Sequence, residues 1–375
     1  MNLSRRSVRI EIDLDAIRSN LLTARRLSPG SSLFATIKAD AYGHGAVAVA
    51  QALSPAGTQA AHRSASRAEH ADGFAVVTID EALELRDAGI DQPILVLQGP
   101  QNPDACSVLK QHKLWPVIHD LVQYHWYRQY AERSHVQAWL KVDTGMGRLG
   151  VSPAEAETIL ASDHGVQWHG ILTHFACADE PENSFTTQQI NTFNNLRYSQ
   201  PLQRSMANSA AVLAWPTARS DWARPGIMLY GCNPLNRALP AGSTLIPAMN
   251  VSAPLISVKS MTSGSGIGYA QTYRCPEGMR VGYVALGYRD GIPRVLNEEA
   301  TVCIEGKACP VIGRVSMDSL AVDLRQTHNP QPGDLARLWG SDVSVDALAA
   351  SAGTINYELL TSIRGDRLYT QCKTD

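Results

Sequence analysis

Phe34-Ala-Thr-Ile-Lys-Ala-Asp-Ala-Tyr-Gly-His-Gly45 is the stretch around which this chain is organised. Residues 33–37 are apolar or β-branched, a pattern that predicts a buried parallel strand. The strand runs into Lys38, then into a turn with two glycines and an Ala/Val-rich helix from about residue 46. Burial lowers the pKa of a lysine, which favours Schiff-base formation and general-base work. The alternative is a lysine whose charged end simply extends into water.

The composition indicates a soluble globular enzyme. The 375 residues suit a barrel of about 250 residues plus a smaller domain. The net charge of −2 gives no reason to expect nucleic acid or membrane partners, and no apolar run is long enough to span a bilayer. Seven scattered cysteines without a C-x-x-C pair predict neither a disulfide framework nor a metal site. We therefore expect a cytoplasmic protein.

Short apolar segments alternate with helical patterns through the first two thirds of the chain. Val8 to Leu14 reads as a strand, after which Asp15 is expected to cap a helix through Leu27. Eight further segments predict a closed (β/α)8 barrel, with an open doubly wound sheet as the alternative. These expected strands are residues 33–38, 74–78, 94–97, 115–118, 136–142, 168–174, 203–207 and 224–229.

Two local features accompany this pattern. A helix is expected over residues 80–88, begun by Asp80 and ended by Gly89. The polar stretch 54–72 interrupts the alternation and is expected to be an inserted surface loop or a longer helix.

From Pro240 the pattern changes to short strands divided by Gly and Pro turns. We therefore expect two domains, a barrel over residues 1–240 and a mainly β domain over 241–375. The expected strands are 254–261, 281–286, 301–305, 308–312, 320–324 and 335–339, followed by a helix over 344–350.

Reactive side chains fall at or just after the ends of the expected barrel strands. Barrel enzymes build their active sites on the face where the strands end, so this coincidence predicts an enzyme. The residues are Lys38, Lys141, Arg148, His174, Asn208, Ser209 and Arg224.

The octapeptide from Lys38 to Gly45 resembles the signature of alanine racemases that use pyridoxal 5'-phosphate (PLP). The resemblance covers most of residues 9–361 and implies a barrel with a C-terminal β domain, PLP carried on Lys38, and a head-to-tail homodimer with shared active sites. It departs from the family pattern at the 54–72 insertion, at Arg289 and in the tail 363–368.

The segment from Lys141 to Gly150 also resembles a racemase motif. The resemblance implies that Lys141 is carbamylated by carbon dioxide and orients Arg148, which approaches the cofactor and the substrate carboxylate. A carbamate would turn a cation into an anion that can accept a fork of hydrogen bonds from arginine. The plainer interpretation is a lysine paired with Asp143.

Loops after the last two barrel strands often bind phosphate. Ser209 and the N–H groups of Gly226 and Ile227 are the candidates here, while Asn208-Ser209 also reads as a simple helix cap. By resemblance, the cofactor-binding residues also include Tyr42, Asn208 and Tyr357.

The resemblance places Arg224 against the pyridine nitrogen of PLP, with His174 close by. Arginine only donates, so that nitrogen would stay unprotonated and the cofactor would be a weaker electron sink. This arrangement favours racemisation over transamination. The alternatives are a salt bridge from Arg224 to Asp221 and a hydrogen-bonded core histidine at His174.

The β domain supplies the second base by resemblance, at Tyr269 within Ser265-Gly-Ile-Gly-Tyr-Ala-Gln-Thr-Tyr273. A tyrosine has an ordinary pKa near 10, so it needs nearby cations to act as a base. The Met317 N–H is matched to a group that binds the substrate carboxylate. The entrance residues implied by the family are Asp179, Tyr288, Arg294 and Arg314.

The expected activity is therefore the interconversion of L-alanine and D-alanine by two bases, Lys38 and Tyr269, because the proton must return to the opposite face. Such an enzyme supplies D-alanine for peptidoglycan or catabolises it. Three alternatives stay open: a racemase of broader specificity, a non-catalytic PLP-binding protein, and a related decarboxylase.

Overall fold

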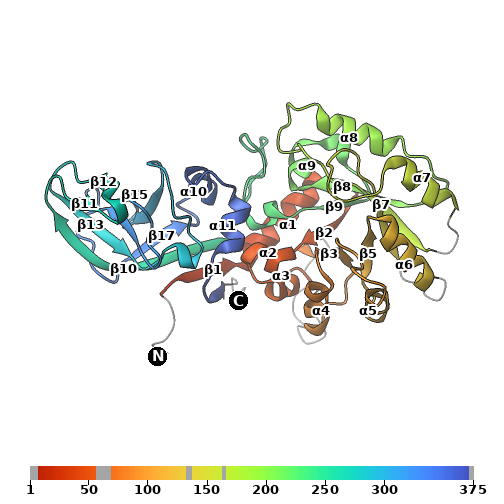
Figure 1. The fold of residues 1–375 in the computed structure, drawn as a ribbon, viewed down its shortest axis with the longest axis horizontal. Helices are drawn as coiled ribbons and strands as arrows, with labels where there is room; N and C mark the ends of the chain where they lie inside the picture. Colours follow the sequence, from red (N-terminus) through yellow and green to blue (C-terminus); the bar gives the residue numbers. More distant parts are fainter. Residues whose placement is uncertain (1–6, 56–68, 132–136, 163–165, 371–375) are drawn as a thin grey trace. The chain divides into compact units, whose positions relative to one another are not determined.

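The computed structural model describes residues 7–55, 69–131, 137–162 and 166–370, which form two compact units (Figure 1). One unit holds most of residues 17–245, and the other holds the described residues up to Ala16, a short piece at Tyr42–His44 and the residues from Ile246. The first strand therefore groups with the C-terminal part of the chain and not with the barrel. Residues 56–68 of the expected insertion lie outside the described residues.

The first unit is a closed barrel of parallel strands, which confirms the predicted fold class (Figure 1). Each strand pairs with the next along the chain, and the last closes on the first with Ser32 beside Trp222. The strands are β2 (Ser32–Thr36), β3 (Gly73–Val76), β4 (Ile94–Val96), β5 (Trp115–Ile118), β6 (Ala138–Lys141), β7 (Trp168–Leu172), β8 (Gln203–Asn208) and β9 (Trp222–Arg224).

Helices follow the strands, as the alternating pattern predicts. The α-helices are α1 (Leu14–Leu27), α2 (Lys38–Gly43), α3 (Ala46–Ala52), α4 (Ile79–Asp87), α5 (Ala105–Gln111), α6 (Leu121–Ala131), α7 (Pro153–Ser162), α8 (Phe185–Asn194) and α9 (Ser209–Ala214), and η2 (Pro216–Ala218) and η3 (Ile227–Tyr230) are 3-10 helices. Within the described residues, no helix is long and apolar enough to cross a membrane.

The eighth barrel strand is shorter than expected. We expected it over 224–229, but β9 ends at Arg224 and η3 begins at Ile227. Pro225 has no N–H for a sheet ladder, so the strand cannot continue through it. As a result Arg224 is the last residue of its strand.

At the N-termini of two helices, the capping residue differs from the one that the sequence predicts. Asp13, not Asp15, caps α1, because its Oδ1 accepts the N–H of Asp15 at 2.9 Å and of Ala16 at 3.0 Å. Helix α4 begins after Thr78, not at Asp80, and Thr78 forms a reciprocal capping box with Glu81.

The barrel interior is filled by large side chains. Phe34 stacks on Trp222 with ring centroids 4.0 Å apart and meets Trp139 edge-on at 5.8 Å. A Cβ at Gly170 would lie 2.6 Å from the Trp139 ring, so only glycine leaves room for that ring. The described side chains thus fill the barrel interior, and barrels of this kind bind their ligands at the strand ends.

The second unit is built on one mixed sheet with the strand order β13-β16-β15-β14-β17-β10-β1-β18. The N-terminal strand β1 pairs antiparallel with β10 and parallel with β18. The strands are β1 (Arg9–Asp13), β10 (Met249–Met261), β13 (Met279–Val284), β14 (Thr301–Ile304), β15 (Lys307–Ile312), β16 (Leu320–Asp323), β17 (Leu335–Trp339) and β18 (Arg367–Thr370).

Smaller elements complete this unit, several of them not expected from the sequence. The helix predicted over 344–350 is present as α10 (Val345–Ser351). The others are the two-stranded sheet of β11 (Gly266–Ile267) and β12 (Tyr273–Arg274), the 3-10 helices η4 (Tyr269–Gln271) and η5 (Tyr288–Asp290), and α11 (Asn356–Ser362).

Candidate active site

The strand ends of the barrel carry the reactive side chains expected there. Lys141 and Arg224 are the last residues of β6 and β9. Lys38 follows the end of β2 by two residues, and His174 follows β7 in the same way. Because all strands of a parallel barrel end on one face, these groups share one surface.

The charges of these groups act on one another. Burial and the charge of Arg148 lower the pKa of Lys38, and Glu81 acts in the opposite direction. Burial and the neighbouring Arg224 and Arg148 lower the pKa of Lys141 to about 8. Excess positive charge in a half-buried site favours an anionic ligand.

His174 lies within the same cluster. Burial, followed by the charges of Arg224 and Lys141, lowers its pKa well below the usual value. The imidazole is therefore neutral at physiological pH and can accept as well as donate a hydrogen bond.

The backbone after Lys38 takes an unusual conformation. Residues 39–42 all have positive φ, between 51° and 54°, so α2 is a left-handed turn. This conformation costs an L-residue roughly 1–2 kcal/mol. Contacts on both sides hold it, because Ala41 N–H donates to Ile37 O at 2.8 Å and Asp40 Oδ1 accepts the Ala46 N–H at 2.7 Å.

Arg224 is buried and fixed in the barrel wall. Its Nη1 donates to Ser205 Oγ at 2.5 Å, and its Nη2 donates to the carbonyl oxygens of Thr173 at 2.5 Å and Met206 at 3.3 Å. Burial lowers its pKa to about 10. No ion pair joins it to Asp221 within the described chain. These bonds use three of its five N–H donors, which leaves the Nε–H and one Nη1–H for a ligand.

Asn208 and Ser209 make different contacts. Asn208 caps α9, with its side-chain oxygen accepting the Ala211 N–H at 3.0 Å. Ser209 Oγ accepts the N–H groups of Gly226 at 2.8 Å and Met228 at 3.3 Å. In the described part of the chain its own hydroxyl proton has no acceptor, although the residue is buried.

The loop after β6 presents Arg148. Asp143 does not pair with Lys141; its Oδ1 accepts the N–H groups of Gly145 at 2.9 Å and Met146 at 2.8 Å and so shapes the turn. Arg148 is exposed and borders a groove of about 500 Å³, whose other lining residues include Gln98, His119, Gln123 and Trp126.

Tyr269 lies at the tip of the β11–β12 hairpin in the β unit. Its side chain is 65% exposed, so its own unit provides little cover for it. Gly268 has φ 67°, Ala270 φ 60° and Gln271 φ 46°, which makes the tip a tight left-handed turn. The tyrosine is thus displayed on a constrained loop.

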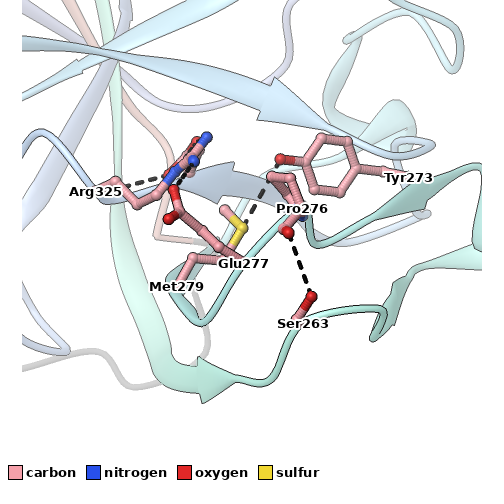
Figure 2. A network of polar contacts seen from close by, with 7 residues as sticks. Ser263, Tyr273, Pro276, Glu277, Met279 and Arg325 are labelled. Carbon is pink, nitrogen blue, oxygen red and sulfur yellow. Dashed lines mark hydrogen bonds and ion pairs between the residues drawn. The ribbon is translucent and has the colours of Figure 1, made fainter.

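Polar contacts anchor the base of this hairpin, as Figure 2 shows. Arg325 joins Glu277 at 2.5 Å to Asp323 at 2.7 Å, and the Tyr273 hydroxyl contacts Met279 Sδ at 3.8 Å. These contacts connect the chain that leaves the hairpin to the main sheet of the unit.

The segments expected at the substrate entrance meet within the β unit. Tyr288 N–H donates to Ser316 O at 3.0 Å, and Val315 N–H donates to Arg294 O at 3.2 Å. The fold therefore brings together the segments that carry Tyr288, Arg294, Arg314 and Met317, whose side chains are exposed. Asp179, in the barrel unit, is exposed as well.

The β unit also holds two tyrosines that resemblance assigns to cofactor binding. The rings of Tyr42 and Tyr357 lie 5.9 Å apart, and burial followed by the nearby Tyr357 raises the pKa of Tyr42. The tail 363–368, which departs from the family pattern, runs into β18. Arg367, the first residue of β18, donates its Nε–H to Gly43 O at 2.6 Å.

Three residues of the site escaped the sequence interpretation. Thr173 and Ser205 bind Arg224 from neighbouring strands, and nothing in the sequence identifies them. Glu81 contacts the backbone beside Lys38, and the capping-box signature from Thr78 to Glu81 could have located it. Within the described residues, no group of His, Cys, Asp or Glu side chains is placed to hold a metal ion.

A closed barrel with a half-buried lysine and a cluster of cations at its strand ends defines an enzyme of the (β/α)8 class with a site for an anionic cofactor and substrate. Family models for the alanine racemase N-terminal and C-terminal domains match residues 12–234 and 248–370. The chain belongs to the alanine racemase family.

Individual relatives extend along the whole chain. Alanine racemase from Thioalkalivibrio sulfidiphilus is 44% identical over 96% of this chain and 98% of its own length. The crystal structure of biosynthetic alanine racemase from Pseudomonas aeruginosa matches with a TM-score of 0.88 and 39% identity, covering 97% of this chain and 99% of that one. The crystal structure of alanine racemase from Bartonella henselae with covalently bound pyridoxal phosphate matches with a TM-score of 0.86 and 26% identity. The match covers 97% of this chain and 99% of that one.

Proposed function

We propose that this protein is a PLP-dependent alanine racemase that interconverts L-alanine and D-alanine. The observation that carries the proposal is the group of cations around half-buried Lys38 at the strand ends of the barrel, in a chain that belongs to this family along its length. The family relationship implies that PLP binds covalently to Lys38. The amine of Lys38, with its lowered pKa, suits that bond.

The residues present fit such a cofactor. Within the described residues, the buried Ser209 hydroxyl has a proton without an acceptor, and the family resemblance assigns the Ile227 N–H at the start of η3 as a further phosphate donor. The Gly226 N–H, which the resemblance also assigns to the phosphate, donates to Ser209 Oγ in this structure and so supports the site through that hydroxyl. The N–H donors that Arg224 retains suit the pyridine nitrogen, and neutral His174 belongs to the same cluster. Further contacts are assigned by resemblance to Tyr42, Arg148, Asn208 and Tyr357.

The bound cofactor would draw electrons from the substrate Cα and so make its proton easier to remove. Lys38 holds or releases that proton on one face, and Tyr269 does so on the other. Because arginine only donates, Arg224 would leave the pyridine nitrogen of a bound cofactor as an acceptor without its own proton, which would make the cofactor a weaker electron sink and favour racemisation over transamination. Arg148 and the Met317 N–H bind the substrate carboxylate.

Lys141 would contribute to the site as a carbamate, which carries a negative charge where the lysine carries a positive one. With a pKa of about 8, a useful fraction of its amine is neutral at physiological pH, and the neutral amine is the form that reacts with carbon dioxide. The resulting carbamate would pair with Arg148 and reduce the repulsion among the cations.

The active unit is proposed to be a cytoplasmic homodimer with shared sites. Tyr269 is 65% exposed, and the entrance residues Tyr288, Arg294 and Arg314 are exposed as well. Exposed reactive groups of this kind are suited to complete a site on a partner chain, with Asp179 at the same entrance. The physiological role of the enzyme is either to supply D-alanine for peptidoglycan synthesis or to catabolise D-alanine.

The cofactor assignment is tested by borohydride reduction. Purified protein should be yellow, and reduction should fix the cofactor to the peptide that contains Lys38, as located by mass spectrometry. Racemase activity should disappear with that label. Attachment to Lys141 instead, or a colourless protein that binds no added PLP, would refute the assignment.

A further inference from the structure

Glu81 links the end of β3, the start of α4 and the backbone beside Lys38. One carboxylate oxygen, Oε1, accepts the N–H of Ala39 at 2.8 Å. The other, Oε2, accepts the N–H groups of Val77 at 2.6 Å and Thr78 at 3.2 Å. A single side chain therefore joins the residue after Lys38 to the neighbouring strand–helix junction.

We propose that Glu81 is a positioning residue for Lys38, whose carboxylate holds the left-handed turn in place and sets the local charge at the lysine. The proposal rests on the proposed role of Lys38. It adds a residue that neither the sequence motifs nor the family resemblance identified.

The backbone on both sides of Lys38 is held by a hydrogen bond, and Glu81 accepts one of these two bonds. On one side of the lysine, Ile37 N–H donates to Ala75 O of β3 at 2.9 Å. On the other side, Ala39 N–H donates to Glu81. The second anchor acts on a turn whose positive φ angles are unfavourable for L-residues. Small displacements of a reacting group slow catalysis, so the two hydrogen bonds that hold the backbone around Lys38 should affect the reaction rate.

The same carboxylate opposes the positive charges around Lys38. Burial and Arg148 lower the pKa of the lysine, and Lys141 and His174 belong to the same coupled cluster. Glu81 is the carboxylate that raises that pKa. Without its charge, the pKa of Lys38 should fall further and its amine should react at lower pH.

Two variants separate positioning from helix capping. Glu81→Gln removes the charge and leaves one acceptor oxygen, which cannot serve Ala39 and the α4 start together. Thr78→Ala removes the other half of the capping box, the bond from Glu81 N–H to Thr78 Oγ1, but keeps the carboxylate. Both weaken the start of α4. Glu81→Asp keeps the charge on a shorter side chain and serves as a third variant.

The experiment uses the full-length protein without cofactor, so it does not depend on racemase activity. The rate at which formaldehyde and cyanoborohydride methylate Lys38 is measured against pH by mass spectrometry, and hydrogen exchange is followed at the Ala39 amide. We expect Glu81→Gln to move the methylation profile to lower pH and to speed Ala39 exchange. Thr78→Ala should change neither, and Glu81→Asp should speed the exchange while moving the profile less than Glu81→Gln.

An unchanged methylation profile and unchanged Ala39 exchange in folded Glu81→Gln would overturn the proposal. Equal changes in Thr78→Ala would also overturn it, because the effect would then be that of a lost helix cap. If Lys38 does not carry the cofactor, the borohydride label will be absent from it in the wild type, whatever these variants do. The two failures are therefore distinguishable.

Discussion

Replacing Lys141 by methionine should make the cofactor-free protein more stable in buffer depleted of carbon dioxide. Lys141 is half-buried at the end of β6, among the charges of Arg224, Arg148 and Lys38. Methionine has a similar length and no charge, so the variant removes the electrostatic penalty and keeps most of the packing.

The magnitude follows from the pKa of the lysine. Burial, with the nearby arginines, lowers it from 10.5 to about 8, and each pH unit corresponds to about 1.36 kcal/mol. Below pH 8 the lysine is charged in both states and the folded state carries the whole penalty, about 3 kcal/mol at pH 7. Between pH 8 and 10.5 the unfolded state holds more protons, so wild-type stability rises and the penalty falls to about 1.4 kcal/mol at pH 9.5.

Urea unfolding of wild type and Lys141→Met at pH 7 and pH 9.5 measures this difference. The variant should be more stable at both values, with the larger gain at pH 7 and unchanged m-values. Lys307→Met, on the exposed start of β15, is the matched control and should show no such gain. Added bicarbonate should stabilise the wild type but not Lys141→Met, because only the lysine can form a carbamate.

Two results would contradict this reasoning. A gain that is the same at both pH values would mean that the charge of Lys141 is not the source of the effect. If bicarbonate stabilised both proteins equally, the stabilisation would come from carbon dioxide bound elsewhere or from a general salt effect, and not from a carbamate on Lys141.

Three further predictions follow from the site and the core. Ser209→Ala leaves two backbone N–H groups without their acceptor, so it should cost about 1–3 kcal/mol of stability and weaken PLP binding about tenfold or more in equilibrium dialysis; unchanged affinity would remove Ser209 from the phosphate site. Gly170→Ala forces a Cβ against the Trp139 ring and should cost about 3 kcal/mol in urea unfolding, and a neutral result would mean that the barrel interior can relax. Lys38→Ala and Tyr269→Ala should each be nearly inactive, yet refolding them together should restore activity through one intact site in each heterodimer. Confirmed heterodimers without activity would show that each site comes from a single chain.

The sequence located most secondary structure because burial leaves a strong pattern. Seven barrel strands lie within a few residues of their expected ranges, and the eighth differs because Pro225 ends it early. Helix starts were less well predicted. Asp13 and Asp15 both have capping side chains, as do Thr78 and Asp80, and only the backbone conformation decides which residue caps.

The sequence by itself determined the residue types and the placement of Lys38 and Lys141 at strand ends, which can be read from local periodicity. The expected strand over 224–229 began at Arg224, and only the structure places this residue at the end of β9. Only the tertiary structure decided which groups act on one another. The pairing of strands brings Arg224 against Thr173 and Ser205 and places Glu81 on the Ala39 backbone. It also buries Lys141 among other cations, and burial followed by their charges lowers its pKa. The physical reason is that hydrogen bonds and charge coupling depend on distances across strands that are far apart in sequence, whereas hydrophobic periodicity reports only how each segment faces its own core.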